Sequence, residues 1–189
     1  MLRLTLVLAC ACPLLALADP AQHQSRIDSS ASNYRGIVSI NQAAGDYQQQ
    51  SNARALAIGL AGSAATQQRQ TLQVDDIQPA LNATASIDGA AFTAGSGVLG
   101  VNQSAGAATQ QANSVRISIQ TAPLSLDDSV LAQSVAITAN SGPVVATPGE
   151  RRVVTDDKAF VGSRGVVQLN QSAGVGSRMA NTLSIRVAD

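Results

Sequence analysis

The chain has 189 residues, equal numbers of acidic and basic side chains, only 2% aromatic residues and no tryptophan. A nucleic-acid-binding protein would be expected to show a basic surface with stacking aromatics, and this composition offers neither. Gln, Asn, Ser, Ala and Gly supply most of the polar character, which is typical of a secreted structural or fibrous protein rather than an enzyme.

The first segment has the pattern of a secretory signal peptide. Arg3 precedes an apolar run over residues 4–17, and an Ala-Leu-Ala sequence ends at Ala18. The pattern predicts a signal peptide over residues 1–18, because the run is shorter than the ~20 residues of a spanning helix. A lipoprotein signal ending at Cys10 or Cys12 is the alternative, but the preceding residues fit a lipobox poorly. The mature chain would then contain no cysteine and no disulfide.

Residues 19–35 follow as a polar stretch and are interpreted as a mobile N-terminal tail. It contains His23, the only histidine of the chain.

Three ungapped 23-residue segments then share one pattern: residues 36–58, 97–119 and 165–187. Each begins with Gly and aliphatic residues, continues as Asn-Gln-x-Ala-Gly, and has a second Asn seven residues after that Gly. Such self-similarity is the signature of a repeat architecture. The shared positions are Asn41, Gln42, Ala44, Gly45 and Asn52 in the first segment, Asn102, Gln103, Ala105, Gly106 and Asn113 in the second, and Asn170, Gln171, Ala173, Gly174 and Asn181 in the third.

Each repeat is predicted to form a strand, a turn and a second strand. Aliphatic residues alternate at period two on both sides of the Asn-Gln pair, and Gly can reverse the chain between them. A helix over the Ala- and Gln-rich middle is the alternative, but Gly and β-branched residues oppose it. Stacked in register, the repeats would place Asn on Asn and Gln on Gln every ~4.8 Å, and side-chain amides can both donate and accept along such a column. The expected fold is therefore all-β, a β-solenoid or cross-β stack, with the fifteen shared residues as a self-assembly ladder.

Two spacers, residues 59–96 and 120–164, separate the repeats and are expected to be irregular. They hold four prolines and three Asp-Asp pairs, which oppose continued strand pairing. Short apolar pieces such as residues 130–137 are still compatible with strands.

The search for chemistry finds no catalytic, metal-binding or cofactor-binding residues. His23 lacks a Cys or His partner and is interpreted as an exposed tail residue. The Asp-Asp pairs could bind Ca²⁺, but they have no regular spacing and no EF-hand loop pattern, so solvated turns are the preferred interpretation.

The NQSAG and QQAN sequences, in three copies split by long spacers after a signal peptide, resemble the functional-amyloid subunits of the Fap system of Pseudomonas. They are also similar to curli repeats, in which the copies follow one another directly. The Fap resemblance implies an exported subunit of extracellular cross-β fibrils in the biofilm matrix. Its implied partners are other amyloid subunits, an outer-membrane export machinery and a periplasmic chaperone. The size and three-copy layout are similar to the minor, nucleating subunit, and the Cys-x-x-Cys of the major subunit is missing from the predicted mature chain.

Two classes of function remain open. One is a structural protein, fibril subunit or nucleator, that assembles by templated strand addition. The other is a non-polymerising β-solenoid, either a surface adhesin or an accessory factor of fibril export. A soluble solenoid needs polar capping elements, and only two residues follow the third repeat, so assembly is the favoured expectation.

Overall fold

The computed structural model describes residues 20–60, 63–74, 81–120, 133–139 and 149–188. The predicted signal peptide lies outside these residues. The described chain is all-β, as expected, and contains no helix that is long and apolar enough to cross a membrane.

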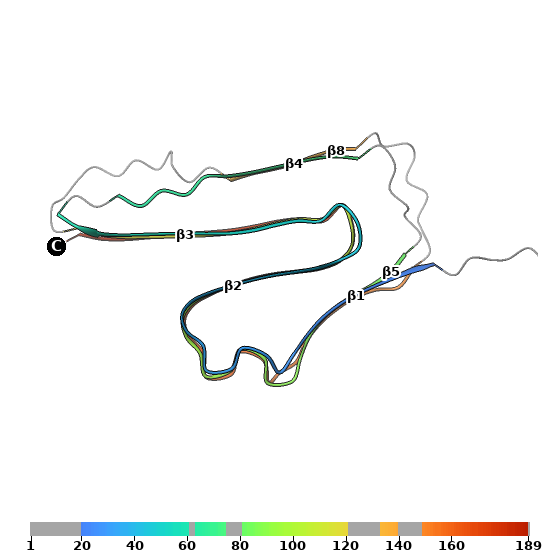
Figure 1. Cartoon of the computed structure of the whole chain (residues 1–189), viewed down its shortest axis with the longest axis horizontal. Helices are drawn as coiled ribbons and strands as arrows, with labels where there is room; N and C mark the ends of the chain where they lie inside the picture. The colour runs from blue at the N-terminus through green and yellow to red at the C-terminus, as the bar shows by residue number, and fades with distance from the viewer. Residues whose placement is uncertain (1–19, 61–62, 75–80, 121–132, 140–148, 189) are drawn as a thin grey trace, which may run out of the picture.

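The first four strands follow a serpentine path in which each one folds back against the one before it, and β5 then starts again beside β1 (Figure 1). In chain order, the strands are β1 (Ala21–Asp28), β2 (Arg35–Ala44), β3 (Gln49–Gly59), β4 (Gln68–Val74), β5 (Leu81–Asp88), β6 (Ser96–Ala107), β7 (Gln110–Gln120), β8 (Gln133–Ala139), β9 (Arg151–Thr155), β10 (Arg164–Val175) and β11 (Arg178–Ala188).

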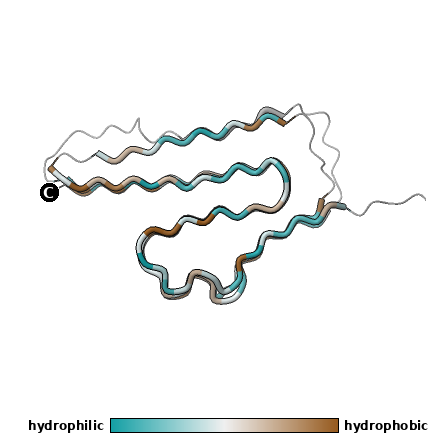
Figure 2. Tube along the Cα trace, in the orientation of Figure 1, coloured by the Kyte–Doolittle hydropathy of each residue, from teal (hydrophilic) through white to brown (hydrophobic). Residues whose placement is uncertain are grey.

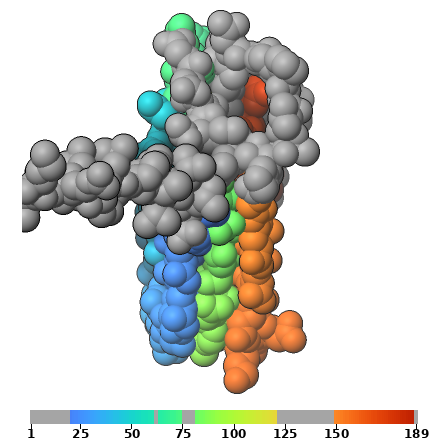
Figure 3. Space-filling model, turned by 90° about the vertical axis from the view of Figure 1, so that its right-hand side faces the viewer, coloured from blue at the N-terminus to red at the C-terminus, as the bar shows by residue number. Residues whose placement is uncertain are grey.

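The serpentine is repeated along the chain, and the copies stack as parallel, in-register rungs. We call β1–β4 rung 1, β5–β8 rung 2 and β9–β11 rung 3. Strands at the same place in successive rungs pair to form four sheets, ordered β1-β5-β9, β2-β6-β10, β3-β7-β11 and β4-β8. In the second sheet Asn41 pairs with Asn102, and Asn102 with Asn170. Figure 3 shows the rungs side by side as blue, green and orange bands.

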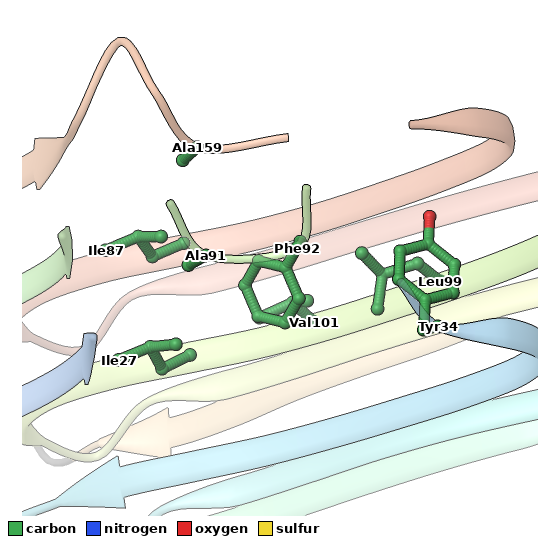
Figure 4. Close-up of a cluster of buried hydrophobic side chains, with 8 residues drawn as sticks. All are labelled: Ile27, Tyr34, Ile87, Ala91, Phe92, Leu99, Val101 and Ala159. Carbon is green, nitrogen blue, oxygen red and sulfur yellow. The ribbon is translucent and has the colours of Figure 1, made fainter. Parts of the chain in front are cut away.

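The core lies between the first two sheets and is built mostly by rung 2. Ile87, Phe92, Leu99 and Val101 are completely buried there (Figure 4). The Phe92 ring stacks on Phe160 of rung 3 with a centroid distance of 5.1 Å. A short stack without this apolar layer would be marginal in water, so these aliphatic and aromatic contacts hold the first sheet onto the second.

The arch between the second and third sheets divides into a polar and an apolar half. Apolar residues of β2 and β3 gather at the open end of the arch, and polar residues lie toward the turn that joins the two strands (Figure 2). The repeat motif therefore occupies the turn half, where amides rather than aliphatic side chains fill the space between sheets.

The structure differs from the sequence expectation in the predicted tail and spacers. The 19–35 tail contains β1, whose inward-facing Ser25 and Ile27 are buried, and the spacers contain β4, β5, β8 and β9. The spacer prolines fall between these strands in sequence, so they do not interrupt pairing. The apolar piece at 130–137 overlaps β8, as its composition allowed. The predicted tail and spacers thus supply the outer sheets, β1-β5-β9 and β4-β8, on the two sides of the repeats.

Candidate functional site

The asparagines of the repeats form two facing columns inside the arch. Within rung 2, Asn113 Nδ2 donates to Asn102 Oδ1 at 3.0 Å. Between rungs, Asn102 Nδ2 donates to Asn41 Oδ1 at 2.9 Å, and Asn170 Nδ2 donates to Asn102 Oδ1 at 2.9 Å. The facing column repeats this arrangement through Asn52, Asn113 and Asn181. Six side-chain amides from three rungs therefore form one hydrogen-bonded network.

The same amides also bond to the backbone across the arch. Asn102 Nδ2 donates to the Ser51 carbonyl at 2.9 Å, and Asn113 Nδ2 donates to the Val101 carbonyl at 3.1 Å. Both asparagines are completely buried. A buried polar group left without a partner costs about 1–3 kcal/mol, and here the network satisfies both ends of each amide.

The glutamines form a third column on the opposite face of the second sheet. Gln103 Nε2 donates to Gln42 Oε1 at 3.0 Å, and Gln171 Nε2 donates to Gln103 Oε1 at 2.9 Å. Gln103 also donates to the Ser86 carbonyl of β5 at 2.8 Å. This column therefore joins the second sheet to the first, whereas the asparagines join it to the third.

The Ala and Gly positions of the motif allow close approach of neighbouring backbones. Ala105 is completely buried and packs with Ala83 and Ala85. Gly106 has a φ of +122°, and a Cβ there would overlap the carbonyl oxygen of Gly174 in the next rung. Glycine suits this position for two reasons. It adopts the positive φ without strain, and a larger residue would push the two rungs apart.

All fifteen residues predicted for the ladder thus lie in columns across the three rungs, and their role between separate copies is a proposal taken up below. The aligned sets are Asn41, Asn102 and Asn170; Gln42, Gln103 and Gln171; Ala44, Ala105 and Ala173; Gly45, Gly106 and Gly174; and Asn52, Asn113 and Asn181.

Sequence reasoning missed a further glutamine contact next to the asparagines. Gln50 Nε2 donates to Gln111 Oε1 at 2.9 Å, and Gln111 Nε2 donates to the Gln103 carbonyl at 2.9 Å. The equivalent position in rung 3 is Met179, which ends this column. The shared Gln-Gln pairs at 49–50 and 110–111 were the signal that could have found it.

An arginine also lies inside the arch, which the sequence pattern did not predict. Arg54 Nη2 donates to Asn52 Oδ1 at 3.3 Å, and burial lowers the pKa of its guanidinium. Gly100 leaves the necessary room, because a Cβ on Gly100 would overlap that guanidinium.

A charged column lies at the end of the first sheet, outside the repeats. Asp28 and Asp88 pair in register, and Arg26 contacts both, with Nη2 at 2.8 Å from Asp28 Oδ2 and Nε at 2.7 Å from Asp88 Oδ2. The hydrogen bond from Arg26, helped by one from Ser86, holds the pKa of Asp88 below its usual value. In the described part of the chain, no group of three or more His, Cys, Asp or Glu side chains is arranged to hold a metal ion.

Parallel in-register strands with stacked side-chain amides define an amyloid-type β-stack. The chain matches the model of the functional amyloid protein FapB/FapC family over residues 14–188. It therefore belongs to that family, and the resemblance noted from the repeats is confirmed at this level. No solved structure matches the chain.

Proposed function

We propose that the exported chain assembles into extracellular amyloid fibrils in which copies stack head to tail, rung 3 of one against rung 1 of the next. Biofilm support is the role that the family suggests. Secretion through an outer-membrane machinery with a periplasmic chaperone belongs to the same proposal and follows from the family resemblance.

The observation that carries this proposal is the donor direction of the Asn and Gln columns of the motif, whereas the neighbouring Gln50–Gln111 bond runs the other way. In the Asn and Gln columns of the motif, each bond between rungs is donated by the later rung to the earlier one. Asn102 Oδ1 accepts from both Asn113 and Asn170, whereas Asn170 Oδ1 accepts from Asn181 within its own rung. The rung-3 face therefore presents amide oxygens with acceptor capacity, and the amide nitrogen of Asn41 on rung 1 matches them.

The burial of rung 2 supports the same docking. Asn102 and Gln103 are completely buried between two rungs, whereas the equivalent Asn41 is exposed on the rung-1 face. A second copy on that face would give Asn41 the surroundings that Asn102 already has. The exposed strand edges of the end rungs are a template for parallel strand addition.

A glycine column provides the test. Gly36, Gly97 and Gly165 pair in register, and a Cβ on Gly97 or Gly165 would overlap the glycine carbonyl of the preceding rung. A Cβ on Gly36 meets nothing within 4 Å, and among the described residues no strand pairs with β2 on that side. In a head-to-tail stack it would meet Gly165 of the preceding copy.

We therefore expect Gly36→Ala to abolish elongation of wild-type seeds, measured by thioflavin fluorescence and by sedimentation. Gly176→Ala is the matched control. Gly176 has a φ of +71°, and a Cβ there would meet nothing within 4 Å. The equivalent position in rung 2 is already an alanine, Ala108, with a φ of +53°. The control should elongate seeds at close to the wild-type rate. Wild-type elongation by Gly36→Ala would contradict head-to-tail stacking, and a wild-type chain that stays monomeric would favour an adhesin or accessory factor.

The same faces suit a nucleator, because one end rung can template the first added strand. We further propose that the chain is a nucleator. Substoichiometric amounts of it should then shorten the lag time of fibril formation by a fibre-forming family member that carries the same motif. An unchanged lag would assign the chain to the body of the fibril.

A further inference from the structure

In the first sheet, a column of side chains that differ in size faces the motif glycines. His23, Ala83 and Arg151 pair in register on β1, β5 and β9. The His23 ring lies against Gly45, and the Cδ and Nε atoms of Arg151 lie 3.2 and 3.6 Å from the point that a Cβ on Gly174 would occupy. The large members of this column therefore belong to the two end rungs, and the small one to the middle.

The glycines show which way these side chains lean. A Cβ on Gly45 would point at the Gly106 carbonyl, and a Cβ on Gly106 would point at the Gly174 carbonyl. The same direction at Gly174 points away from rung 2, beyond the end of the stack. Arg151 occupies that space, so its side chain lies over the rung-3 face.

Within the chain, each large side chain of this column has a small neighbour. The His23 ring leans toward rung 2, where the column residue is the completely buried Ala83. Across a head-to-tail junction the order becomes His23, Ala83, Arg151 and then His23 of the next copy. The guanidinium of Arg151 would then meet an imidazole instead of a methyl group.

We propose that Arg151, acting against His23 of the incoming copy, is a built-in brake on fibril elongation. The proposal rests on the head-to-tail function above. Arg151 must leave the rung-3 face before rung 1 of another copy can pair, and steric crowding against the His23 ring opposes its return. Among the described residues, no carboxylate forms an ion pair that would hold Arg151 away from this face.

The chain contains a matched control for this brake. Arg152 carries the same charge on the same strand but points to the opposite face, where it pairs in register with Thr84. Replacing either arginine by alanine changes the net charge equally, and only Arg151→Ala clears the junction.

The experiment measures the elongation rate of each variant on wild-type seeds at equal concentration. Arg151→Ala should elongate about two- to fivefold faster than wild type, the size expected for relieving one weak surface contact. Arg152→Ala should match wild type. His23→Ala should also be faster, and the double variant should be no faster than the better single one, because both changes relieve one contact.

Equal rates for Arg151→Ala and Arg152→Ala would overturn the brake, and so would full additivity of the His23 and Arg151 changes. If the wild-type chain forms no seeds, or does not elongate them, the proposed self-assembly fails instead. The two failures are therefore distinguishable.

Discussion

At the scale of single residues, the motif uses asparagine because each position needs a donor and an acceptor at once. Asn102 accepts from Asn113 and Asn170 and donates to Asn41 and to the Ser51 carbonyl. A carboxylate of the same shape could accept but could not donate. The column is therefore stabilised by the amide group, which both donates and accepts, and not by the size of the side chain.

Asn102→Asp should accordingly destabilise the fold by about 3 kcal/mol or more, because an unpaired charge would be buried among carbonyl oxygens. Asn41→Asp is the matched control, since Asn41 lies at the exposed end of the same column. Guanidinium unfolding of the two variants, followed by circular dichroism, measures the difference. Equal midpoints for the two variants would show that the column does not depend on amides.

The Arg26–Asp88 pair gives a prediction for pH. Because the hydrogen bond from Arg26 lowers the pKa of Asp88 in the folded chain, its stabilisation is present above the unfolded value of about 3.9 and is lost as the pH falls through the folded value. Wild type should therefore exceed Asp88→Asn in urea midpoint at pH 7, and the two should converge near ~pH 2. A difference that persists unchanged in acid would contradict this role.

At the scale of elements, the sequence predicted the strands of the three repeats and not the outer strands that pack against them. β2, β3, β6, β7, β10 and β11 share the motif. β1, β5 and β9 pair in register, but residues at the same position can differ chemically, as Ser25, Ala85 and Val153 do. Sequence identity between the three repeats revealed the amide columns. The outer strands are instead specified by burial against neighbouring strands, and a pattern along the sequence does not show that burial.

The turn glycines give the prediction that belongs to elements. A Cβ on Gly106 would overlap the Gly174 carbonyl, so Gly106→Ala should separate β6 from β10 and cost about 2 kcal/mol or more. Gly162→Ala is the control, because Gly162 also has a positive φ of +73° but its nearest neighbour atoms lie at 3.8 Å. Thermal unfolding followed by circular dichroism compares them, and equal losses would mean that backbone strain alone explains the glycine.

At the scale of the whole molecule, head-to-tail assembly requires that one chain folds into stacked rungs before or while copies join. Sequence repeats alone do not distinguish stacking within a chain from stacking between chains, because both use the same contacts. The in-register partners 61 and 68 residues apart, as in Asn41–Asn102 and Asn102–Asn170, assign the stack to the single chain. The strands of rungs 1 and 3 are the edge strands of the three-stranded sheets among the described residues, and from these edges the head-to-tail proposal follows.

The most direct test of the stacked single chain is a spin-pair measurement in fibrils. Gln24 and Arg152 face outward in the same column two rungs apart, through Thr84, so nitroxides on cysteines at both positions should lie about 10 Å apart. The labels would be placed in a Cys10→Ser, Cys12→Ser background, and labelled chains diluted into an excess of unlabelled ones. Strong dipolar broadening that survives dilution is the predicted result. Broadening that disappears on dilution would show that the rungs form only between chains and would contradict the account.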